Sequence, residues 1–508
     1  MSKAHRIGRT PDPQTMTGGL VELTAPLPPG PLVNADLAPT TVGRRTWNLW
    51  HIASLWVGMS VCIPTYMLAA SMVGAGMTWR QSLVAILLGN LIVLVPMVIN
   101  AHAGTRYGIP FPVYARAAFG TTGAHIPSLL RSVVACGWFG IQTWVGGLAI
   151  HALVGILWPA WPTLGGDWRF MGYGLPHFAA FFAFWVINMY FVWAGTDSIK
   201  VLETLSAPLL IAMGLALLGW AATRAGGLGA VLAQADALPR PGTATGGRFV
   251  LTVFVPWMTA MVGFWATLSL NIPDFTRFAR SQRDQMAGQA LGLLTTMPLF
   301  AFIGVAVTSA TVILYGEAIW NPVDLLSRLT AESSSPVPGI VALIAVLIAT
   351  LTTNIAANVV APANSFSALL PRRVSFRLGG LIAGLIGIGI FPWKLLDRYQ
   401  TWLIGYSGLL GAVAGVIVCD YLVVRRGQLA LPDLYAVDGR YAYTGGVNRR
   451  AVLALAAGVL AALAGLAHPA LRFLFDGAWF SAALVAGGLY WLLMRPERGM
   501  RNAERGTA

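Results

Sequence analysis

Runs of apolar residues recur along the whole chain and are separated by short segments that carry most of its charged residues. Each run is close to the ~20 residues that cross a bilayer as a helix, and the runs lack the alternation typical of membrane barrel strands. The pattern predicts an all-α polytopic membrane protein with twelve transmembrane helices, at 48–74, 81–101, 121–155, 174–194, 201–222, 249–270, 288–315, 337–361, 376–392, 400–424, 451–467 and 475–494.

Two of these spans carry helix-breaking residues near their middle. The first contains Gly58 and Pro64, and the sixth contains Pro256 and Gly263. Interrupted helices five spans apart are typical of an inverted repeat of five plus five helices, in which backbone carbonyls freed at the breaks face a binding cavity. The alternative is that these residues only reflect the general frequency of glycine and proline in transmembrane helices.

Composition supports a membrane location. Of the 508 residues, 56% are hydrophobic and only 10% are charged, which leaves too few polar side chains to cover a soluble protein. The net charge of +14 does not indicate nucleic-acid binding, because the basic residues lie mainly in the connectors, where they orient helices and meet lipid headgroups. The three cysteines, Cys62, Cys136 and Cys419, have no paired spacing and indicate neither disulfides nor a metal site.

The distribution of charge also sets the orientation. With the N-terminus inside, most of the 33 lysines and arginines fall on the cytoplasmic side, which predicts cytoplasmic termini in the plasma (inner) membrane. The residues up to about Pro39 lack a signal-peptide core and are expected to be mobile. The predicted organisation is a cytoplasmic N-terminal tail (1–45), a first repeat (46–222), an external loop (223–248), a second repeat (249–424), a cytoplasmic connector (425–450), two additional helices (451–494) and a cytoplasmic tail (495–508).

Residues 137–144 (GWFGIQTW) place two indoles, an amide and a hydroxyl inside the third span. Trp138 and Gln142 are four residues apart and share a helix face, so they offer a flat π surface beside a hydrogen-bonding amide. This face is suited to a small planar polar ring. The alternative is an interfacial aromatic belt with an amide that binds a neighbouring helix. Trp144 lies about 200° around the helix from Gln142 and is expected to pack or to face lipid.

The eighth span carries hydroxyl and amide side chains among apolar residues. The hydroxyls of Thr352 and Thr353, with carbonyls near Gly58 and Val61, would form an oxygen cage suited to Na⁺. Asn354 and Asn358 are also four residues apart, so the same helix presents two amides on one face. The alternative is that these residues only join helices through hydrogen bonds.

The acidic residues bear on the coupling ion. Each of the 19 aspartates and glutamates can be placed in a tail, a loop or near a helix end, whereas proton-coupled carriers usually keep a titratable group near mid-membrane, so Na⁺ is favoured over H⁺. His102, His125 and His151 lie near span ends or on apolar faces and are interpreted as structural. With no cluster of nucleophile, base or metal ligands, the sequence does not favour a membrane-embedded enzyme, and a channel would need a continuous pore.

Several segments, taken in order along the chain, resemble the nucleobase-cation symporter 1 family, whose members carry purines, pyrimidines, allantoin, hydantoins and some vitamins. The similarity extends from about residue 40 to 450 and rests on residues 46–69, 88–92, 103–113, 137–144, 271–277, 353–358, 420–426 and 433–435. The resemblance implies a LeuT-type inverted-repeat fold with broken helices 1 and 6, two extra C-terminal helices and cation-coupled alternating access.

The resemblance also implies roles for particular residues. The substrate ring would lie between Trp138 and Trp265, with Gln142 and Asn358 hydrogen-bonded to its edges. The implied sodium ligands are the backbone carbonyls of Gly58, Val61 and Ala349 and the hydroxyls of Thr352 and Thr353. The sequence departs from the family pattern twice: Cys62 stands where hydantoin-carrying relatives can place an amide, and Phe264 stands where a glycine can occur and should narrow the pocket.

The expected function is secondary active import of a uracil-, hydantoin- or allantoin-like ring by cation symport, with Na⁺ as the coupling ion and no other cofactor. A proton-coupled permease for a purine or vitamin is the alternative. The expected partners are the small substrate and the bilayer, without nucleic acid or an obligatory protein partner.

Overall fold

Helices make up most of the chain that the computed structural model describes, which is residues 14–33, 37–194, 196–237, 246–370 and 373–506. Among these residues, nine helical segments are long and apolar enough to cross a membrane, and a bent pair of helices makes a tenth. Pro208–Arg224 and Phe376–Gly389 are apolar but shorter. Each of the twelve predicted spans therefore coincides with a helix, while the count of twelve crossings stays a prediction.

The helices that match the predicted spans overlap them. They are α1 (Leu49–Ser60) with α2 (Ile63–Gly74), α3 (Trp79–Tyr107), α5 (His125–Leu157), α6 (Leu175–Ala194), α7 (Thr196–Arg224), α10 (Val255–Asn271), α12 (Gln282–Tyr315), α14 (Val337–Asn358) with α15 (Val360–Leu369), α16 (Phe376–Gly389), α18 (Tyr399–Val418), α19 (Arg449–Ala467) and α21 (Ala478–Gly506). Helices α15 and α21 continue beyond the expected ends at 361 and 494.

Shorter elements connect these helices. They include the helices α4 (Phe111–Phe119), α8 (Leu228–Ala237), α9 (Gly247–Phe249), α11 (Pro273–Thr276), α13 (Pro322–Glu332), α17 (Pro392–Asp397) and α20 (Arg472–Asp476), the π-helical turns η4 (Val250–Phe254) and η5 (Cys419–Val424), and two antiparallel hairpins, β1 (Gln14–Thr17) with β2 (Leu20–Leu23) and β3 (Arg169–Phe170) with β4 (Tyr173–Gly174).

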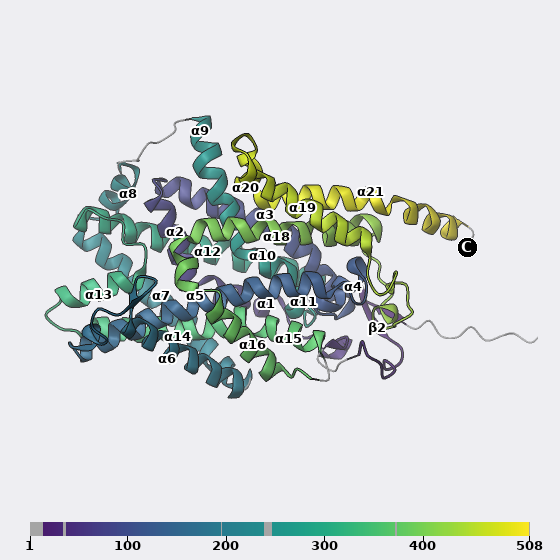
Figure 1. The fold of residues 1–508 in the computed structure, drawn as a ribbon, viewed down its shortest axis with the longest axis horizontal. Coiled ribbons are helices and arrows are strands. Elements are labelled where there is room, and N and C mark those ends of the chain that lie inside the picture. The colour runs from purple at the N-terminus through teal and green to yellow at the C-terminus, as the bar shows by residue number, and fades with distance from the viewer. Residues whose placement is uncertain (1–13, 34–36, 195, 238–245, 371–372, 507–508) are drawn as a thin grey trace, which may run out of the picture.

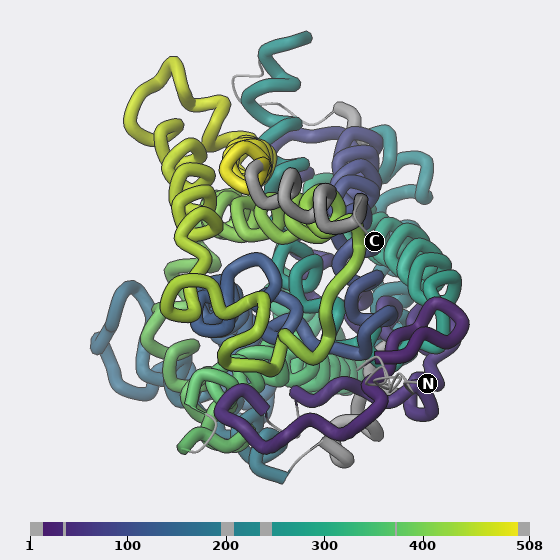
Figure 2. The backbone as a smooth tube through the Cα atoms, turned by 90° about the vertical axis from the view of Figure 1, so that its right-hand side faces the viewer, coloured from purple at the N-terminus to yellow at the C-terminus, as the bar shows by residue number. Residues whose placement is uncertain are grey.

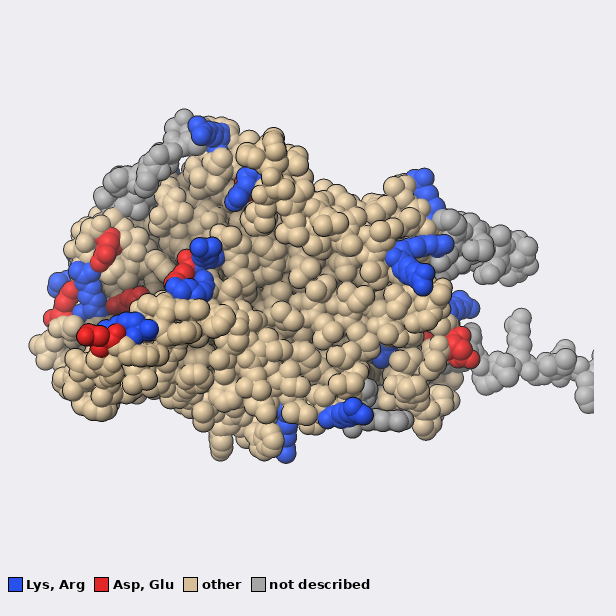
Figure 3. All heavy atoms as spheres, in the orientation of Figure 1, with Lys and Arg blue, Asp and Glu red and all other residues tan. Residues whose placement is uncertain are grey.

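The long helices run roughly side by side along the longest axis of the molecule (Figure 1). Helices α18, α19 and α21 pack together along one side, where Gly415 allows α18 to approach the backbone carbonyl of Ala483 on α21. Most charged side chains visible in Figure 3 lie toward the left and right ends of the molecule in this view. Large apolar side chains remain exposed along the helices, such as Leu460 and Leu484, as a lipid-facing surface requires.

The first span is interrupted, as the sequence predicted. Helices α1 and α2 meet at an angle of 57°. Pro64 has no N–H to donate to the Ser60 carbonyl, which instead accepts from the N–H of Cys62 at 3.1 Å. The N–H of Thr65 bonds to the Cys62 carbonyl at 3.1 Å, one residue further along than in a continuous helix. The carbonyls of Gly58 and Val61 thereby lose their regular helical donors.

The sixth span differs from the prediction, since α10 runs through Pro256 and Gly263 without a break. Pro256 is the second residue of α10 and directly follows the π-helical turn η4, a local irregularity of the kind that accompanies a proline in a helix. Gly263 serves close packing instead: a Cβ there would lie 2.7 Å from the Leu403 carbonyl oxygen of α18. The local structure therefore explains why a proline and a glycine occupy these two positions, and no unwound segment is needed to account for them.

The N-terminal segment also differs from the prediction, because its described part is bound to the helices rather than free. Strands β1 and β2 pair with Gln14 opposite Leu23, and the Gln14 side chain accepts from the backbone of Leu431 at 3.0 Å. Tyr435 donates to the Leu37 carbonyl at 2.6 Å. Figure 2 shows this segment and the connector lying across the same end of the helices. Residues 1–13 of the predicted tail lie outside the described residues.

Arg45 fastens this segment to the helices. Its side chain is 3% exposed, and burial lowers the pKa of its guanidinium to about 10, so the group remains charged at neutral pH. The guanidinium donates to four backbone carbonyls at distances between 2.8 and 3.1 Å, those of Val21, Thr40, Thr105 and Arg106. One side chain thus joins strand β2, the segment before α1 and the C-terminal end of α3.

The connector is anchored by a buried ion pair. The Nε of Arg425 lies 2.6 Å from a carboxylate oxygen of Asp420, and both side chains are almost completely buried. Tyr490 of α21 donates to the second carboxylate oxygen at 2.8 Å, and Arg425 also donates to the Tyr443 hydroxyl. With its charges paired and hydrogen-bonded, this cluster holds the start of the connector against α21.

Replacing Arg45 by alanine should lower the free energy of unfolding by about 3 kcal/mol, because several buried carbonyls lose a charged donor. Arg44→Ala is the matched control, since the neighbouring Arg44 is exposed. Thermal unfolding of the purified protein in detergent measures both variants. Equal losses for the two would contradict the role assigned to Arg45.

Candidate functional site

A small cavity lies beside the break in the first span, enclosed by α1, α2, α5, α10 and α14. Its volume is about 30 Å³, enough for a single water molecule. All six residues predicted to bind substrate contribute to its wall, as does Thr353. The lining residues are Met59, Cys62, Pro64, Trp138, Gln142, Phe264, Trp265, Thr267, Leu268, Thr353, Ala357 and Asn358.

Gln142 carries an unpaired polar atom at this cavity. Its side chain is 4% exposed, and its Oε1 is buried without a hydrogen-bond partner among the described residues. An unpaired buried acceptor costs about 1–3 kcal/mol, and most buried polar groups in folded proteins are paired. The amide is therefore available to a ligand that enters the cavity with an N–H group.

Three aromatic rings crowd the same cavity. The ring of Phe264 lies edge-on to both indoles, with its centroid 5.0 Å from that of Trp138 and 4.8 Å from that of Trp265. Phe264 thus touches both of the rings that were predicted to sandwich the substrate. In this conformation it fills much of the space that a planar ligand would need, which explains the small volume of the cavity.

Trp138 is held in place by a hydrogen-bonded chain that sequence reasoning missed. Its indole N–H donates to the Tyr406 hydroxyl at 3.1 Å, and that hydroxyl donates to the Gly263 carbonyl at 2.8 Å. Trp138 also packs edge-on against Trp402 at 4.9 Å. The signal available in the sequence was a tyrosine within an apolar span, because a buried Tyr hydroxyl needs a partner.

The two asparagines of α14 have different surroundings. The Asn354 amide nitrogen lies 3.2 Å from the Phe139 carbonyl, 3.1 Å from the Thr143 hydroxyl and 3.2 Å from the Asn188 side-chain oxygen. The amide of Asn358 donates to the Asn354 oxygen at 3.0 Å and also lines the cavity. Asn354 therefore joins α5, α6 and α14, while Asn358 places part of its amide at the cavity.

The predicted cation ligands lie on elements that pack together, since α14 contacts both α1 and α2. The Thr352 hydroxyl lies 3.0 Å from the Ala349 carbonyl oxygen, so two of the proposed ligands are adjacent on α14. The break in the first span supplies the Gly58 and Val61 carbonyls. All of these donors are hard oxygens, which suit Na⁺. Their role stays a prediction.

Other polar and aromatic residues singled out in the sequence have structural partners. Trp144 is 1% exposed and packs against Tyr173 at 4.8 Å, in agreement with the expected packing role. His102 contacts the Tyr421 hydroxyl at 2.7 Å, and His151 accepts from the Trp161 indole at 2.9 Å.

Known proteins with similar sequences identify the chain. Residues 39–491 match the family model described as permease for cytosine/purines, uracil, thiamine and allantoin. The chain belongs to this family, the nucleobase-cation symporter 1 family. Its members are permeases rather than enzymes, as the sequence predicted.

Curated relatives cover most of the chain. A purine-uracil permease of Arabidopsis thaliana is 43% identical over 91% of this chain and 78% of its own length. An allantoin permease of Bacillus subtilis is 39% identical over 91% of this chain and 93% of its own length. The family therefore includes similar proteins with different substrates.

Solved structures confirm the fold class. The inward-facing conformation of Mhp1 superposes with a TM-score of 0.76 at 26% identity and covers 92% of this chain and 95% of the Mhp1 chain. A closed conformation of Mhp1 with bromovinylhydantoin bound gives a TM-score of 0.73 at the same identity, over 91% of this chain and 95% of that one. The permease has this LeuT-type architecture.

Asn354→Ala should lower the free energy of unfolding by about 2–4 kcal/mol, because it leaves several buried polar groups on three helices without partners. Asn358→Ala removes the hydrogen bond from the Asn358 amide to the Asn354 oxygen and should cost about 1 kcal/mol. Thermal or denaturant unfolding of the two purified variants measures the difference. An Asn358 variant that is the less stable of the two would contradict this division of roles.

Proposed function

We propose that this permease imports a small planar ring with alternating C=O and N–H groups, such as uracil, a hydantoin or allantoin, in symport with Na⁺ across the plasma membrane. The observation that carries the proposal is the unpaired Oε1 of Gln142 at a cavity formed beside a broken helix. The relatives that carry purines, uracil or allantoin support this class of substrate.

The polar groups of the cavity suit the edge of such a ring. Gln142 would accept a hydrogen bond from a ring N–H. Asn358 uses one amide hydrogen on Asn354, which leaves its other amide hydrogen and its oxygen for the ligand. A ring whose edge does not match would leave these groups buried without partners, so they would select among rings of similar shape.

The aromatic groups would supply affinity that depends little on ring identity. Each offset or edge-to-face aromatic pair contributes about 0.5–1.5 kcal/mol beyond the burial of area. For a ring to enter between Trp138 and Trp265, the Phe264 side chain must turn away from its present contacts with both. We propose that this turn accompanies loading, so that Phe264 fills the site when no substrate is bound.

The coupling ion would be held where α14 meets the broken span. The proposed ligands are the carbonyls of Gly58, Val61 and Ala349 and the hydroxyls of Thr352 and Thr353. A bound Na⁺ would be coordinated by oxygen atoms of both repeats, and this coordination would hold the first repeat to the second. Thr353 also lines the cavity, which would bring the ion site next to the substrate site.

The proposed orientation has both termini in the cytoplasm. The basic connectors favour this arrangement, because lysine and arginine are retained on the cytoplasmic side. Alternating access would then come from rocking of the first, second, sixth and seventh spans against the third, fourth, eighth and ninth spans.

Gln142→Ala should reduce kcat/KM for uptake of the true substrate by about 10- to 100-fold, because the ring loses a buried hydrogen-bond partner. Radiolabelled uptake by cells, with competition by a panel of nucleobases, hydantoins and ureides, identifies the substrate and measures the loss. Gln400→Ala is the matched control, since Gln400 is a half-buried glutamine of α18 that does not line the cavity. Undiminished uptake by a well-expressed Gln142 variant would refute the site.

Thr352→Val should raise the Na⁺ concentration for half-maximal uptake by about tenfold, because it replaces an oxygen ligand by a methyl group of similar size. Thr350→Val, which changes a buried hydroxyl of the same helix that is not a proposed ligand, should leave the Na⁺ dependence unchanged. Uptake is measured while the sodium and proton gradients are varied separately. Transport that follows the proton gradient alone would exclude the proposed sodium site.

A further inference from the structure

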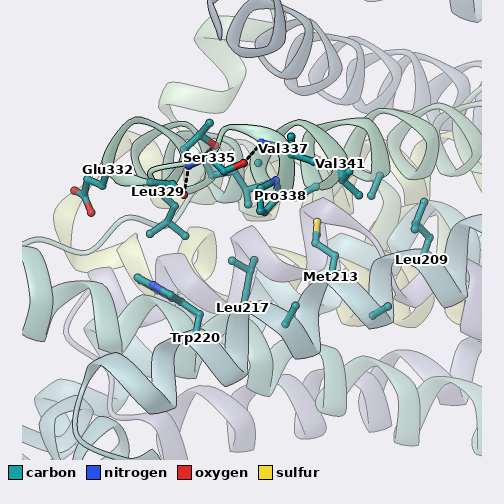
Figure 4. Close-up of a pocket in the computed structure, with 18 of the residues that line it drawn as sticks. Leu209, Met213, Leu217, Trp220, Leu329, Glu332, Ser335, Val337, Pro338 and Val341 are labelled. Carbon is teal, nitrogen blue, oxygen red and sulfur yellow. Dashed lines mark hydrogen bonds between the residues drawn. The ribbon is translucent and has the colours of Figure 1, made fainter.

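A second, much larger cavity is lined by residues that do not take part in the candidate substrate site. It is a groove of about 710 Å³ between α7, α13 and α14. This volume falls within the range of about 300–1,000 Å³ that is typical of sites for small molecules. Figure 4 shows Leu209, Met213, Leu217 and Trp220 in a row along one helix, with Val341 on the facing helix.

The groove is apolar along most of its length and opens at the surface of the helices. Its α7 wall repeats at intervals of three and four residues from Leu209 to Arg224, so one helix face forms it. Val337 and Val341 of α14 line it and are 60% and 58% exposed. Because α14 is apolar and long enough to cross a membrane and Pro208–Arg224 of α7 is apolar, we expect the groove to open to lipid.

The length of the groove corresponds to one leaflet. From Leu209 to Arg224 the helix rises about 22 Å at 1.5 Å per residue. Half of the bilayer hydrocarbon is about 15 Å thick, which leaves room for a headgroup beyond it. Trp220 lies one turn before Arg224, an arrangement typical of residues at the membrane interface.

Charge is confined to one end of the groove, and both signs are present there. The Arg224 side chain is exposed, and no hydrogen bond or ion pair joins it to the side chain or backbone of another described residue. Glu332 lies at the same end, where its carboxylate accepts from Tyr315 at 2.8 Å and pairs with Arg328 at 3.3 Å. Glu332 retains lone pairs and is 48% exposed, so it can accept another donor.

We propose that the groove binds one phosphatidylethanolamine molecule. One of its two acyl chains lies along Met213 and Leu217, its phosphate pairs with Arg224, and its ammonium donates to Glu332. A guanidinium binds phosphate through parallel hydrogen bonds, and an ammonium offers three donors to a carboxylate. Phosphatidylethanolamine offers a partner to both Arg224 and Glu332, whereas phosphatidylglycerol has a phosphate for Arg224 but no ammonium to donate to Glu332.

The small residues of the groove make the site testable without touching its charges. Ala216 lines the groove and is exposed, so a larger side chain there occupies the path of the acyl chain. Leu215 is the next residue on α7, is 54% exposed and does not line the groove. Ala216→Phe and Leu215→Phe therefore form a matched pair.

The test is native mass spectrometry of the purified permease after reconstitution with equal amounts of phosphatidylethanolamine, phosphatidylglycerol and phosphatidylcholine. We expect one retained phosphatidylethanolamine per protein, and a loss of about tenfold in its retention for Arg224→Gln. Glu332→Gln should remove the preference over phosphatidylcholine, which has no N–H donors. Ala216→Phe should abolish retention.

Two control variants, Leu215→Phe and Arg248→Gln, should behave as the unaltered protein, since Arg248 is an exposed arginine outside the groove. Equal retention of the three lipids, a preference for phosphatidylglycerol, or retention that survives Ala216→Phe would each overturn the proposal. The outcome is independent of which substrate or ion the permease carries.

Discussion

The break in the first span is the constraint on which the rest of the site depends. Hydrocarbon offers no partner to a free carbonyl, so an unwound segment is stable only where protein surrounds it. Pro64 removes one helical donor, and the neighbouring N–H groups of Cys62 and Thr65 bond out of register. The break accordingly lies inside the helix bundle, beside the cavity that residues of α5, α10 and α14 help to line.

The enclosing helices divide support and recognition between neighbouring residues. Asn354 satisfies polar groups of α5 and α6, and by doing so it fixes the helix turn that carries Asn358. Tyr406 links the Trp138 indole to the Gly263 carbonyl and so ties α5 to α10 through α18. The groups facing the cavity are held by groups one turn or one helix away, which is how a site between helices keeps its shape.

The sequence was sufficient for features that depend on residues within a single helix. The four-residue spacing of Trp138 and Gln142, and the proline of the first span, were sufficient to predict a shared face and a break. The roles of Pro256 and Gly263 were not accessible, because they depend on a π-helical turn before α10 and on the approach of Leu403 from α18. Asn354 and Tyr406 depend in the same way on partners more than a hundred residues away.

The ordered N-terminal segment was missed for a related reason, since its composition resembles a free tail and its partners come from the other end of the chain. The bond between Gln14 and Leu431 joins residues 417 positions apart. At ordinary rates of synthesis the ribosome needs roughly 20 to 80 s to add that many residues. The hairpin is thus made first but can be docked only when the helices of both repeats are already inserted. Assembly of this end of the molecule therefore marks the completion of a nearly full-length chain.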